Sequence, residues 1–152
     1  MGPMHRKTRE PCRQYLIVGG MPQAVERYVE TRLFKEADMA KRDILDLYNR
    51  SVGQYARGYA EKVKSVFDNI PSELQRHEKR FRLSSISPGA RYRSYESSFL
   101  WLKDAMITNM CYGVTEPTVG MKLVSDQSTF KCYMADTGLL ISHAFDEKTI
   151  QG

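Results

Sequence analysis

Apolar residues recur at helical spacing through the first third of the chain. Residues 11–18 predict a short helix, and the two glycines that follow would end it, because glycine tolerates the positive φ found after many helix ends. Pro22 suits the first turn of a second helix, which continues with apolar residues three and four positions apart. A third helix is predicted over about residues 33–51. The sequence therefore opens with a helical segment.

A second amphipathic pattern starts after a boundary at residues 52–58, where two glycines interrupt the periodicity. Its apolar face predicts a helix and consists of Tyr59, Val63, Val66, Phe67 and Ile70. We expect Pro71 to end this helix and Ser72 to cap a second, short one. Ser87-Pro88 predicts the start of a long helix to about residue 105, since a capping hydroxyl precedes a proline suited to the first turn.

Two stretches with β character follow the long predicted helix. Residues 107–114 and 130–134 are separated by a turn region that contains proline and glycine. The order is therefore helix, short helix, long helix, strand, turn, strand, which is the layout of a winged helix-turn-helix. The predicted fold class is mainly α, with an N-terminal helical segment followed by a winged helix-turn-helix with a small β-wing. After the second strand, we expect Asp136 to cap a turn at Gly138 that opens a short final helix.

The composition is that of a folded globular protein. Over its 152 residues the chain is 41% hydrophobic and 27% charged, which argues against intrinsic disorder and allows one ordinary domain or two small ones. The apolar runs are far too short to cross a bilayer, and the polar first ten residues are unlike a signal peptide. We therefore expect a cytoplasmic protein without membrane contact.

Cysteine and histidine are too scattered to predict a disulfide framework or a metal site. The three cysteines, Cys12, Cys111 and Cys132, show no Cys-x-x-Cys spacing, and the three histidines are equally dispersed. Small unpaired thiols are usually buried in folded proteins. We expect reduced, mostly buried thiols and no bound metal.

Positive charge is concentrated in residues 76–93. The net charge of the chain is +5, and six basic residues against the single acid Glu78 give this stretch the same net charge. The six are Arg76, Lys79, Arg80, Arg82, Arg91 and Arg93. A basic cluster attracts phosphate backbones. The alternative interpretation is a solvated surface with no partner.

Several segments resemble a large family of archaeal and bacterial AAA-type ATPases. In that family a nucleotide-binding domain is followed by a winged helix and then by a C-terminal region of uncertain function with a restriction-nuclease-like fold. The similar segments run in the family's order and are residues 15–25 (YLIVGGMPQAV), 41–48 (KRDILDLY), 67–74 (FDNIPSEL), 95–105 and 130–140 (FKCYMADTGLL). No single segment is specific, but their order and spacing together carry the resemblance.

The resemblance implies that the chain is an interior piece of a larger ATPase, the parent protein. We expect residues 1–10 to be disordered or left over from cloning. The remaining divisions would be a helical lid segment at 11–52, the winged helix at 53–125, and the start of a truncated nuclease-like domain at 126–152. The missing ATPase and C-terminal domains of the parent would then be natural partners of this chain.

The family's phosphate loop would lie before Cys12, and the chain contains no Gly-Lys-Ser or Gly-Lys-Thr. Without that loop no lysine and no converging N–H groups hold the phosphates, so we expect no catalytic residues and no cofactor here. ATP and Mg²⁺ would bind to the parent protein. There the resemblance gives Gly19, Gly20, Met21 and Pro22 a place in a lid over the bound base. In this chain alone they predict a plain corner between two helices.

Two functions remain open for the predicted winged helix. The first is contact with DNA through the six basic residues and Ser97, because Arg93 and Ser97 lie opposite the apolar stripe of the long helix. The second is a protein–protein interaction or domain-connecting module without nucleic-acid binding. It is favoured by Leu100 and Asp104, which also face outward. Trp101 lies beside the stripe and is expected to pack in or at the edge of the core.

Overall fold

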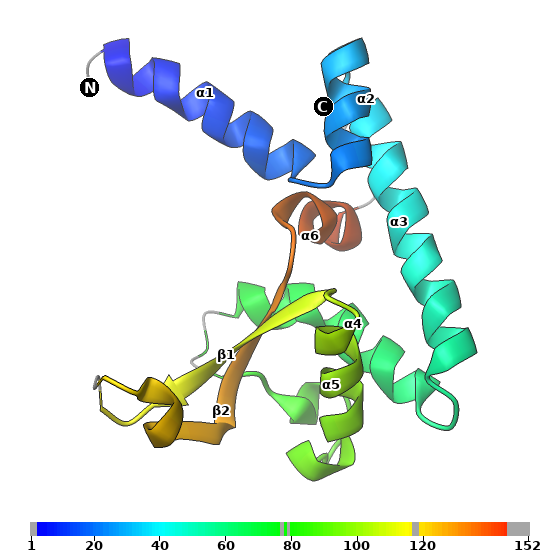
Figure 1. Ribbon diagram of the computed structural model, residues 1–152, viewed down its shortest axis with the longest axis vertical. Coiled ribbons are helices and arrows are strands. Elements are labelled where there is room, and N and C mark those ends of the chain that lie inside the picture. Colours follow the sequence, from blue (N-terminus) through cyan, green and yellow to red (C-terminus); the bar gives the residue numbers. More distant parts are fainter. Residues whose placement is uncertain (1–2, 77, 79, 117–118, 146–152) are drawn as a thin grey trace. The chain divides into compact units, whose positions relative to one another are not determined.

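The computed structural model describes residues 3–76, 78, 80–116 and 119–145 (Figure 1). Over these residues the chain is mainly helical with one small antiparallel sheet, which confirms the coarse prediction of fold class. The chain divides into two compact units. Unit 1 comprises Met1–Arg50 and Asp136–Gly152, and unit 2 comprises Ser51–Ala135.

The unit boundaries differ from the expected divisions in one important way. The first boundary, at Ser51, lies close to the expected one, but residues 126–135 belong to unit 2 rather than to a separate C-terminal segment. The reason is strand pairing: β2 (Ser125–Met134) pairs with β1 (Thr108–Val114) up to the Thr108–Met134 pair. The chain joins unit 1 only from Asp136 onward.

Over its described residues, unit 1 is built from four helices. They are α1 (Pro3–Val18), α2 (Pro22–Thr31), the part of α3 (Phe34–Tyr55) before residue 51, and α6 (Thr137–Ala144). Gly19 has a φ of +81° after α1, and Pro22 occupies the first turn of α2, which confirms the predicted corner. Arg32 ends α2 in a left-handed conformation and donates its N–H to the carbonyl of Tyr28.

Two helices of the N-terminal half are longer than predicted. Helix α1 begins at Pro3, so residues 3–10 are helical where disorder was expected. Its residues 9–13 are all exposed, and a helix without a buried face lacks the apolar periodicity that would reveal it. Helix α3 continues through Gly53, which lies in open space, because one glycine costs only about 1 kcal/mol relative to alanine within a helix.

The core of unit 1 is made of small side chains. Val18, Ala24, Ala37 and Ala40 are buried together, and Met21, Tyr28 and Phe34 pack around them. The rings of Tyr28 and Phe34 stack with centroids 5.0 Å apart. Alanines at the contact let helix backbones approach closely, so the end of α1, α2 and the start of α3 pack as one layer.

A carboxylate joins the corner between α1 and α2 to the start of α6. The Oδ1 of Asp136 accepts the N–H of Leu139 at 2.8 Å, which confirms the predicted cap. Its Oδ2 accepts the N–H of Gly20 at 2.6 Å, across 116 positions of sequence. A Cβ at Gly19 would lie 2.3 Å from Oδ1, and one at Gly138 would lie 2.5 Å from the carbonyl oxygen of Val18. Both glycines are therefore needed for the close approach.

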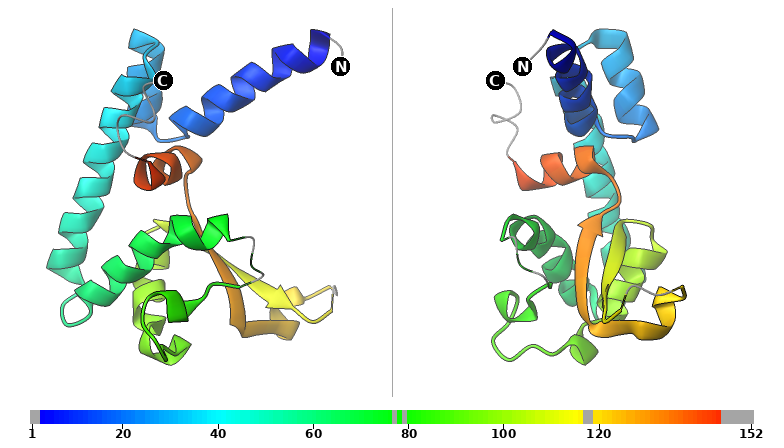
Figure 2. Two further views of the ribbon diagram at one scale, coloured as in Figure 1. Left: turned by 180° about the vertical axis from the view of Figure 1, so that it is seen from behind. Right: turned by 90° about the vertical axis from the view of Figure 1, so that its left-hand side faces the viewer.

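Unit 2 contains the remaining elements. Its helices are α4 (Ala60–Gln75) and α5 (Glu96–Asp104), its 3₁₀ turns are η1 (Leu83–Ser85), η2 (Tyr92–Ser94) and η3 (Met121–Val124), and β1 and β2 form its hairpin. Both strands were predicted, although β2 starts earlier than expected. The pairing shifts register between Tyr112 and Gly113. The end of the hairpin that carries η3 projects beyond α4 and α5 (Figure 2).

Two predicted helix boundaries in unit 2 are wrong. Pro71 lies inside α4, and the Ser72 hydroxyl donates to the carbonyl of Asn69 instead of capping a new helix. The buried side chains of Ile70 and Glu73 hold the helix on both sides of the proline. Ser87-Pro88 lies in a turn region before Gly89 (φ +75°) rather than at a helix start, so the third helix is shorter than predicted.

An aromatic cluster around Phe130 forms the centre of unit 2. The rings of Phe99 and Phe130 meet edge-on, with centroids 5.0 Å apart. The ring centroids of Phe81 and Tyr92 lie 6.1 and 5.3 Å from the centroid of Phe130. The Phe81 N–H donates to the Phe130 carbonyl at 2.7 Å, so the segment after α4 adds one hydrogen bond to the free edge of β2. Helix α4 covers the cluster with apolar residues that include Val63, Val66, Phe67 and Ile70.

We predict opposite effects for two glycine-to-alanine substitutions. Gly19→Ala should lower the free energy of unfolding by at least about 2 kcal/mol, because the new Cβ meets both Asp136 and the backbone of Gly138 at a positive φ. Gly53→Ala should be neutral or stabilise by about 0.5–1 kcal/mol, because the position is helical and open. Urea unfolding followed by circular dichroism measures both. Equal effects of the two variants would contradict the close approach at Gly19.

Candidate functional site

Most of the net positive charge belongs to unit 2. Residues 51–135 contain 12 lysines and arginines against 8 aspartates and glutamates, so unit 2 carries +4 of the total of +5. The predicted cluster at residues 76–93 accounts for this excess. Its residues occupy the end of α4 and the connection to α5, which includes η1 and η2.

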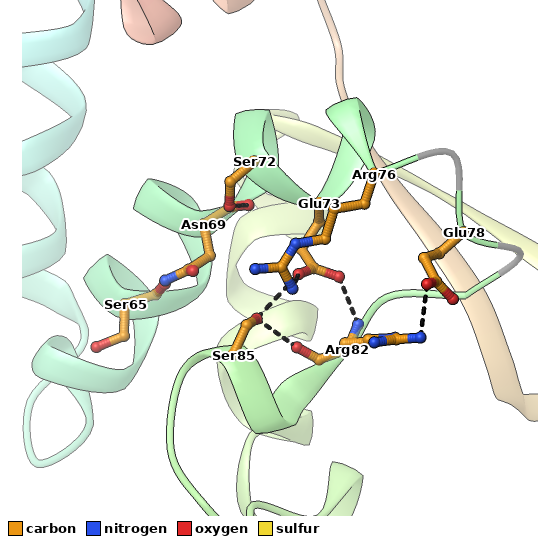
Figure 3. A network of polar contacts seen from close by, with 8 residues as sticks. All are labelled: Ser65, Asn69, Ser72, Glu73, Arg76, Glu78, Arg82 and Ser85. Atoms are coloured by element: carbon orange, nitrogen blue, oxygen red, sulfur yellow. Dashed lines mark hydrogen bonds and ion pairs between the residues drawn. The ribbon is translucent and has the colours of Figure 1, made fainter.

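Two arginines of the cluster are already paired with carboxylates (Figure 3). Arg76 at the end of α4 donates to Glu73 at 2.9 Å, and Arg82 donates to Glu78 at 2.5 Å. Both arginine side chains are about half exposed, at 46% and 48%. Their charges are therefore partly neutralised within unit 2 and contribute less to any external contact.

Glu73 organises the connection after α4. Its side chain is 2% exposed and accepts from Arg76. It also accepts the Ser85 hydroxyl at 2.9 Å and the backbone N–H of Arg82 at 2.7 Å. A buried carboxylate is stable only when such donors compensate for its lost hydration. Glu73 thus fixes η1 against α4, which is a structural role that the sequence analysis did not assign.

Three arginines of the cluster remain open to solvent. Arg80, Arg91 and Arg93 are exposed, and their side chains form no ion pair with any residue that the structure describes. Lys79 was also predicted as a site residue, but it lies outside the described residues. The cluster thus presents three arginines that have no carboxylate partner within the described chain.

The segment that carries Arg91 and Arg93 is firmly anchored. Tyr92 between them packs on Phe99 and Phe130, and burial, followed by the neighbouring Tyr112, raises the pKa of Tyr92 to about 12. The Nζ of Lys62 on α4 donates to the carbonyl of Ser94 at 3.0 Å. Because the tyrosine ring points into the core, its two neighbours are held at the surface just ahead of α5.

The outer face of α5 carries an open hollow with both polar and apolar lining residues. An open hollow of about 450 Å³ is lined by Tyr59, Ser97, Leu100, Trp101, Asp104 and Ala105, and we call it the α5 hollow. Ser97, a predicted site residue, is exposed and lines this hollow. Trp101 is half-buried, at the edge of the core. Leu100 and Asp104 were predicted to face outward, but the α5 hollow itself was not predicted.

The corner at residues 19–22 is occupied by packing. Gly20 gives its N–H to Asp136, Gly19 gives its own to the carbonyl of Tyr15, and Met21 packs against the small core. Pro22 is exposed in the first turn of α2. The amides of Gly19 and Gly20 are therefore both engaged within unit 1.

A buried lysine lies near this corner. The Lys41 side chain is fully buried, and its Nζ donates to the carbonyl of Ile17 at 2.7 Å and lies 3.9 Å from Asp38. Asp38 also accepts from Arg42 at 2.8 Å and from the Ser142 hydroxyl at 2.5 Å. Burial lowers the pKa of Lys41, while Asp38 and Asp136 oppose this shift. These contacts bind α3 to α1 and α6. In the sequence, the only sign of this role is that Lys41 lies four positions after Ala37, on the apolar face of the predicted helix.

The structure corrects the prediction for the cysteines. Cys132 on β2 is buried, and burial raises the pKa of its thiol to about 11, but Cys12 and Cys111 are exposed rather than buried. Over the described parts of the chain, no three histidine, cysteine or carboxylate side chains are placed to share a metal ion. None of the described helices combines the length and apolar character needed to cross a membrane.

Comparison with known proteins gives one match. Residues 9–149 match the model of a protein family described as a domain of unknown function (DUF8612). No curated protein and no solved structure matches the chain.

We predict that the two carboxylates of Figure 3 differ sharply in their contribution to stability. Glu73→Ala should lower the free energy of unfolding by about 1–3 kcal/mol, because it leaves the partly buried backbone N–H of Arg82 without its acceptor and removes the contact of Ser85 with α4. Glu78→Ala removes only an exposed pair and should cost less than about 1 kcal/mol. Chemical denaturation of the two variants side by side tests this, and a larger loss for Glu78→Ala would refute the structural role of Glu73.

Proposed function

The chain belongs to the DUF8612 family of domains of unknown function, and we propose that its unit 2 is a winged helix that contacts the phosphate backbone of DNA. The order of elements supports this proposal. Helix α4 is followed by two short turns, helix α5 and the hairpin of β1 and β2, and Phe81 adds a strand-like hydrogen bond to β2. In a winged helix, the helix that precedes the hairpin faces the DNA, and the hairpin lies against the DNA backbone. In unit 2 that helix is α5.

The observation that carries the proposal is the set of unpaired arginines in the connection between α4 and α5. Arg80, Arg91 and Arg93 are exposed and have no carboxylate partner among the described residues. Exposed arginines bind phosphate oxygens bidentately and release condensed counterions when they do so. Arg76 and Arg82 belong to the same predicted cluster, but their side chains are bound to carboxylates. We therefore propose that they contribute less to the DNA contact.

The chemistry of α5 limits this contact to the backbone. Its outward residues include Glu96 in the first turn, the apolar Leu100 and, near the end, Asp104. Two carboxylates would repel phosphates if the whole helix lay in the major groove, and leucine offers no hydrogen bond to a base edge. We therefore propose DNA contact by the segment before α5, without strong sequence preference.

We also propose that the chain is part of a cytoplasmic AAA-type ATPase. The support is that two segments of the resemblance meet in unit 1: the Gly19-Gly20 corner receives the Asp136 carboxylate of the segment at residues 130–140. Such a contact gives a physical reason for both segments to occur together. In this proposal ATP and Mg²⁺ bind to the parent protein through its phosphate loop, and this chain has no catalytic activity.

A second candidate function is a protein-interaction module. The α5 hollow favours it, because Tyr59 and Trp101 line the hollow and these residue types are enriched at the energetic centres of protein interfaces. The two functions use different ends of α5 and are compatible in one molecule.

We predict that the chain binds duplex DNA with micromolar or weaker affinity at physiological salt. The logarithm of the affinity should fall linearly with the logarithm of salt concentration, with a slope of about −2.7 for three phosphate contacts. Arg91→Glu together with Arg93→Glu should weaken binding at least tenfold, because each substitution replaces an attraction by a repulsion. Fluorescence anisotropy with a labelled duplex measures both quantities.

The matched control is Arg27→Glu together with Lys35→Glu. Both residues are exposed in unit 1, and this pair changes the net charge by the same amount as the Arg91 and Arg93 pair. The control variant should bind DNA almost as tightly as the unchanged chain. Only a small loss of affinity is expected, from the change in net charge at long range. If both double variants bind equally, and both remain folded, the arginines before α5 are not the DNA-contacting surface.

A further inference from the structure

The α5 hollow combines two aromatic rings, an aliphatic side chain and a carboxylate. Tyr59 precedes α4, whereas Leu100, Trp101 and Asp104 lie on the second half of α5. Leu100 is 46% exposed and is therefore accessible to a partner. The hollow is open to solvent and measures about 450 Å³.

Among the residues that the structure describes, Asp104 is the only charged one that lines the α5 hollow. It is exposed and forms no ion pair with any described residue. Its neighbour Lys103 is exposed as well but does not line the hollow. The wall of the hollow is therefore acidic and aromatic, although unit 2 as a whole is basic.

We propose that the α5 hollow binds an arginine side chain presented by a protein partner. A guanidinium group is planar, so it can stack on the ring of Trp101 or Tyr59 while it donates hydrogen bonds to the carboxylate of Asp104. An aliphatic residue next to that arginine would cover Leu100. Tryptophan, tyrosine and arginine are the residues most enriched at the energetic centres of protein interfaces.

The alternatives fit the hollow less well. A nucleic-acid backbone would bring phosphates towards Asp104, and the two negative charges would repel each other. A lysine could pair with Asp104 or lie over an aromatic ring, but its compact, strongly hydrated ammonium group has no planar face that stacks on the ring while it donates to the carboxylate. A purely apolar partner would leave the carboxylate of Asp104 without a counter-charge when water is excluded.

Trp101 provides a direct reporter, because it is the only tryptophan in the chain. We would titrate the whole chain with the capped dipeptide acetyl-Leu-Arg-amide and follow Trp101 fluorescence and its indole N–H signal by NMR. Acetyl-Leu-citrulline-amide is the matched control probe, since citrulline has nearly the same shape as arginine but no charge. The arginine probe should bind saturably in the millimolar range, at least fivefold more tightly than the citrulline probe.

Asp104→Asn should abolish this preference for arginine, so that both probes bind equally weakly. Glu116→Gln, which removes an exposed acid elsewhere in unit 2, should leave the preference unchanged. The inference is overturned if the citrulline probe binds the unchanged chain as well as the arginine probe does, or if Asp104→Asn keeps the preference. The inference is also overturned if the titration with the arginine probe does not saturate when followed by Trp101 fluorescence or by the indole N–H signal.

Arginine binding at the α5 hollow and the proposed DNA contact can be tested independently of each other. Asp104→Asn removes a negative charge and should not weaken DNA binding, whereas Arg91→Glu with Arg93→Glu should not remove the preference for the arginine probe. A lysine probe, acetyl-Leu-Lys-amide, separates stacking from simple charge attraction. Equal binding of the lysine and arginine probes would contradict the stacking role of the aromatic rings.

Discussion

The carboxylate of Asp136 holds unit 1 together. It accepts one N–H from Gly20 and one from Leu139, and so connects segments 116 residues apart. Hydrogen bonds from backbone N–H groups to a buried carboxylate are among the stronger ones in proteins, because the ionised acceptor has lost its water. The bonds are possible only because Gly19 and Gly138 have no side chains at the contact. The end of α1, the start of α2 and the start of α6 are therefore fixed by a single side chain.

Unit 2 depends on a carboxylate in a similar way. Glu73 accepts from Arg76, from Ser85 and from the backbone of Arg82, which ties the connection after α4 to that helix. This use of two arginines for structure changes the interpretation of the basic stretch. Charge that looks uniform along the sequence divides into a paired part at Arg76 and Arg82 and an open part at Arg80, Arg91 and Arg93. The open part is the more available to an anionic partner, because the charges of Arg76 and Arg82 are partly neutralised.

Local signals predicted the elements that have a buried face or a capping residue. Helix α2 begins at Pro22, β1 covers the predicted strand, and Asp136 caps α6. Other signals were overridden by packing. Pro71 remains inside α4 because buried residues on both sides of it hold the helix, and Ser87-Pro88 does not start a helix because its segment turns back at Gly89. The length of helix α1 was underestimated because its residues 9–13 are all exposed and so show no apolar periodicity.

The candidate sites were predictable only in part. The sequence identified the basic residues but not the pairing of Arg82 with Glu78, because Arg82 is in an extended conformation and the four-residue spacing is informative only within a helix. It could not show that Glu73 is buried against the later segment, or that Tyr59 and Trp101 line one hollow, because these contacts depend on how α4 and α5 pack. The contact of Gly20 with Asp136 was hidden for the same reason, as nothing local to either residue reveals the other.

The most direct test of this account is amide hydrogen exchange at Gly20 and Leu139, followed by NMR in the unchanged chain and in Asp136→Ala. Both amides should be protected in the unchanged chain, and both should lose at least tenfold in protection when the carboxylate is removed. The amide of Phe81, which bonds to Phe130 within unit 2, serves as the internal reference and should keep its protection. If Gly20 exchanges as fast as an open amide in the unchanged chain, or if both amides stay protected in Asp136→Ala, the carboxylate does not hold unit 1 together.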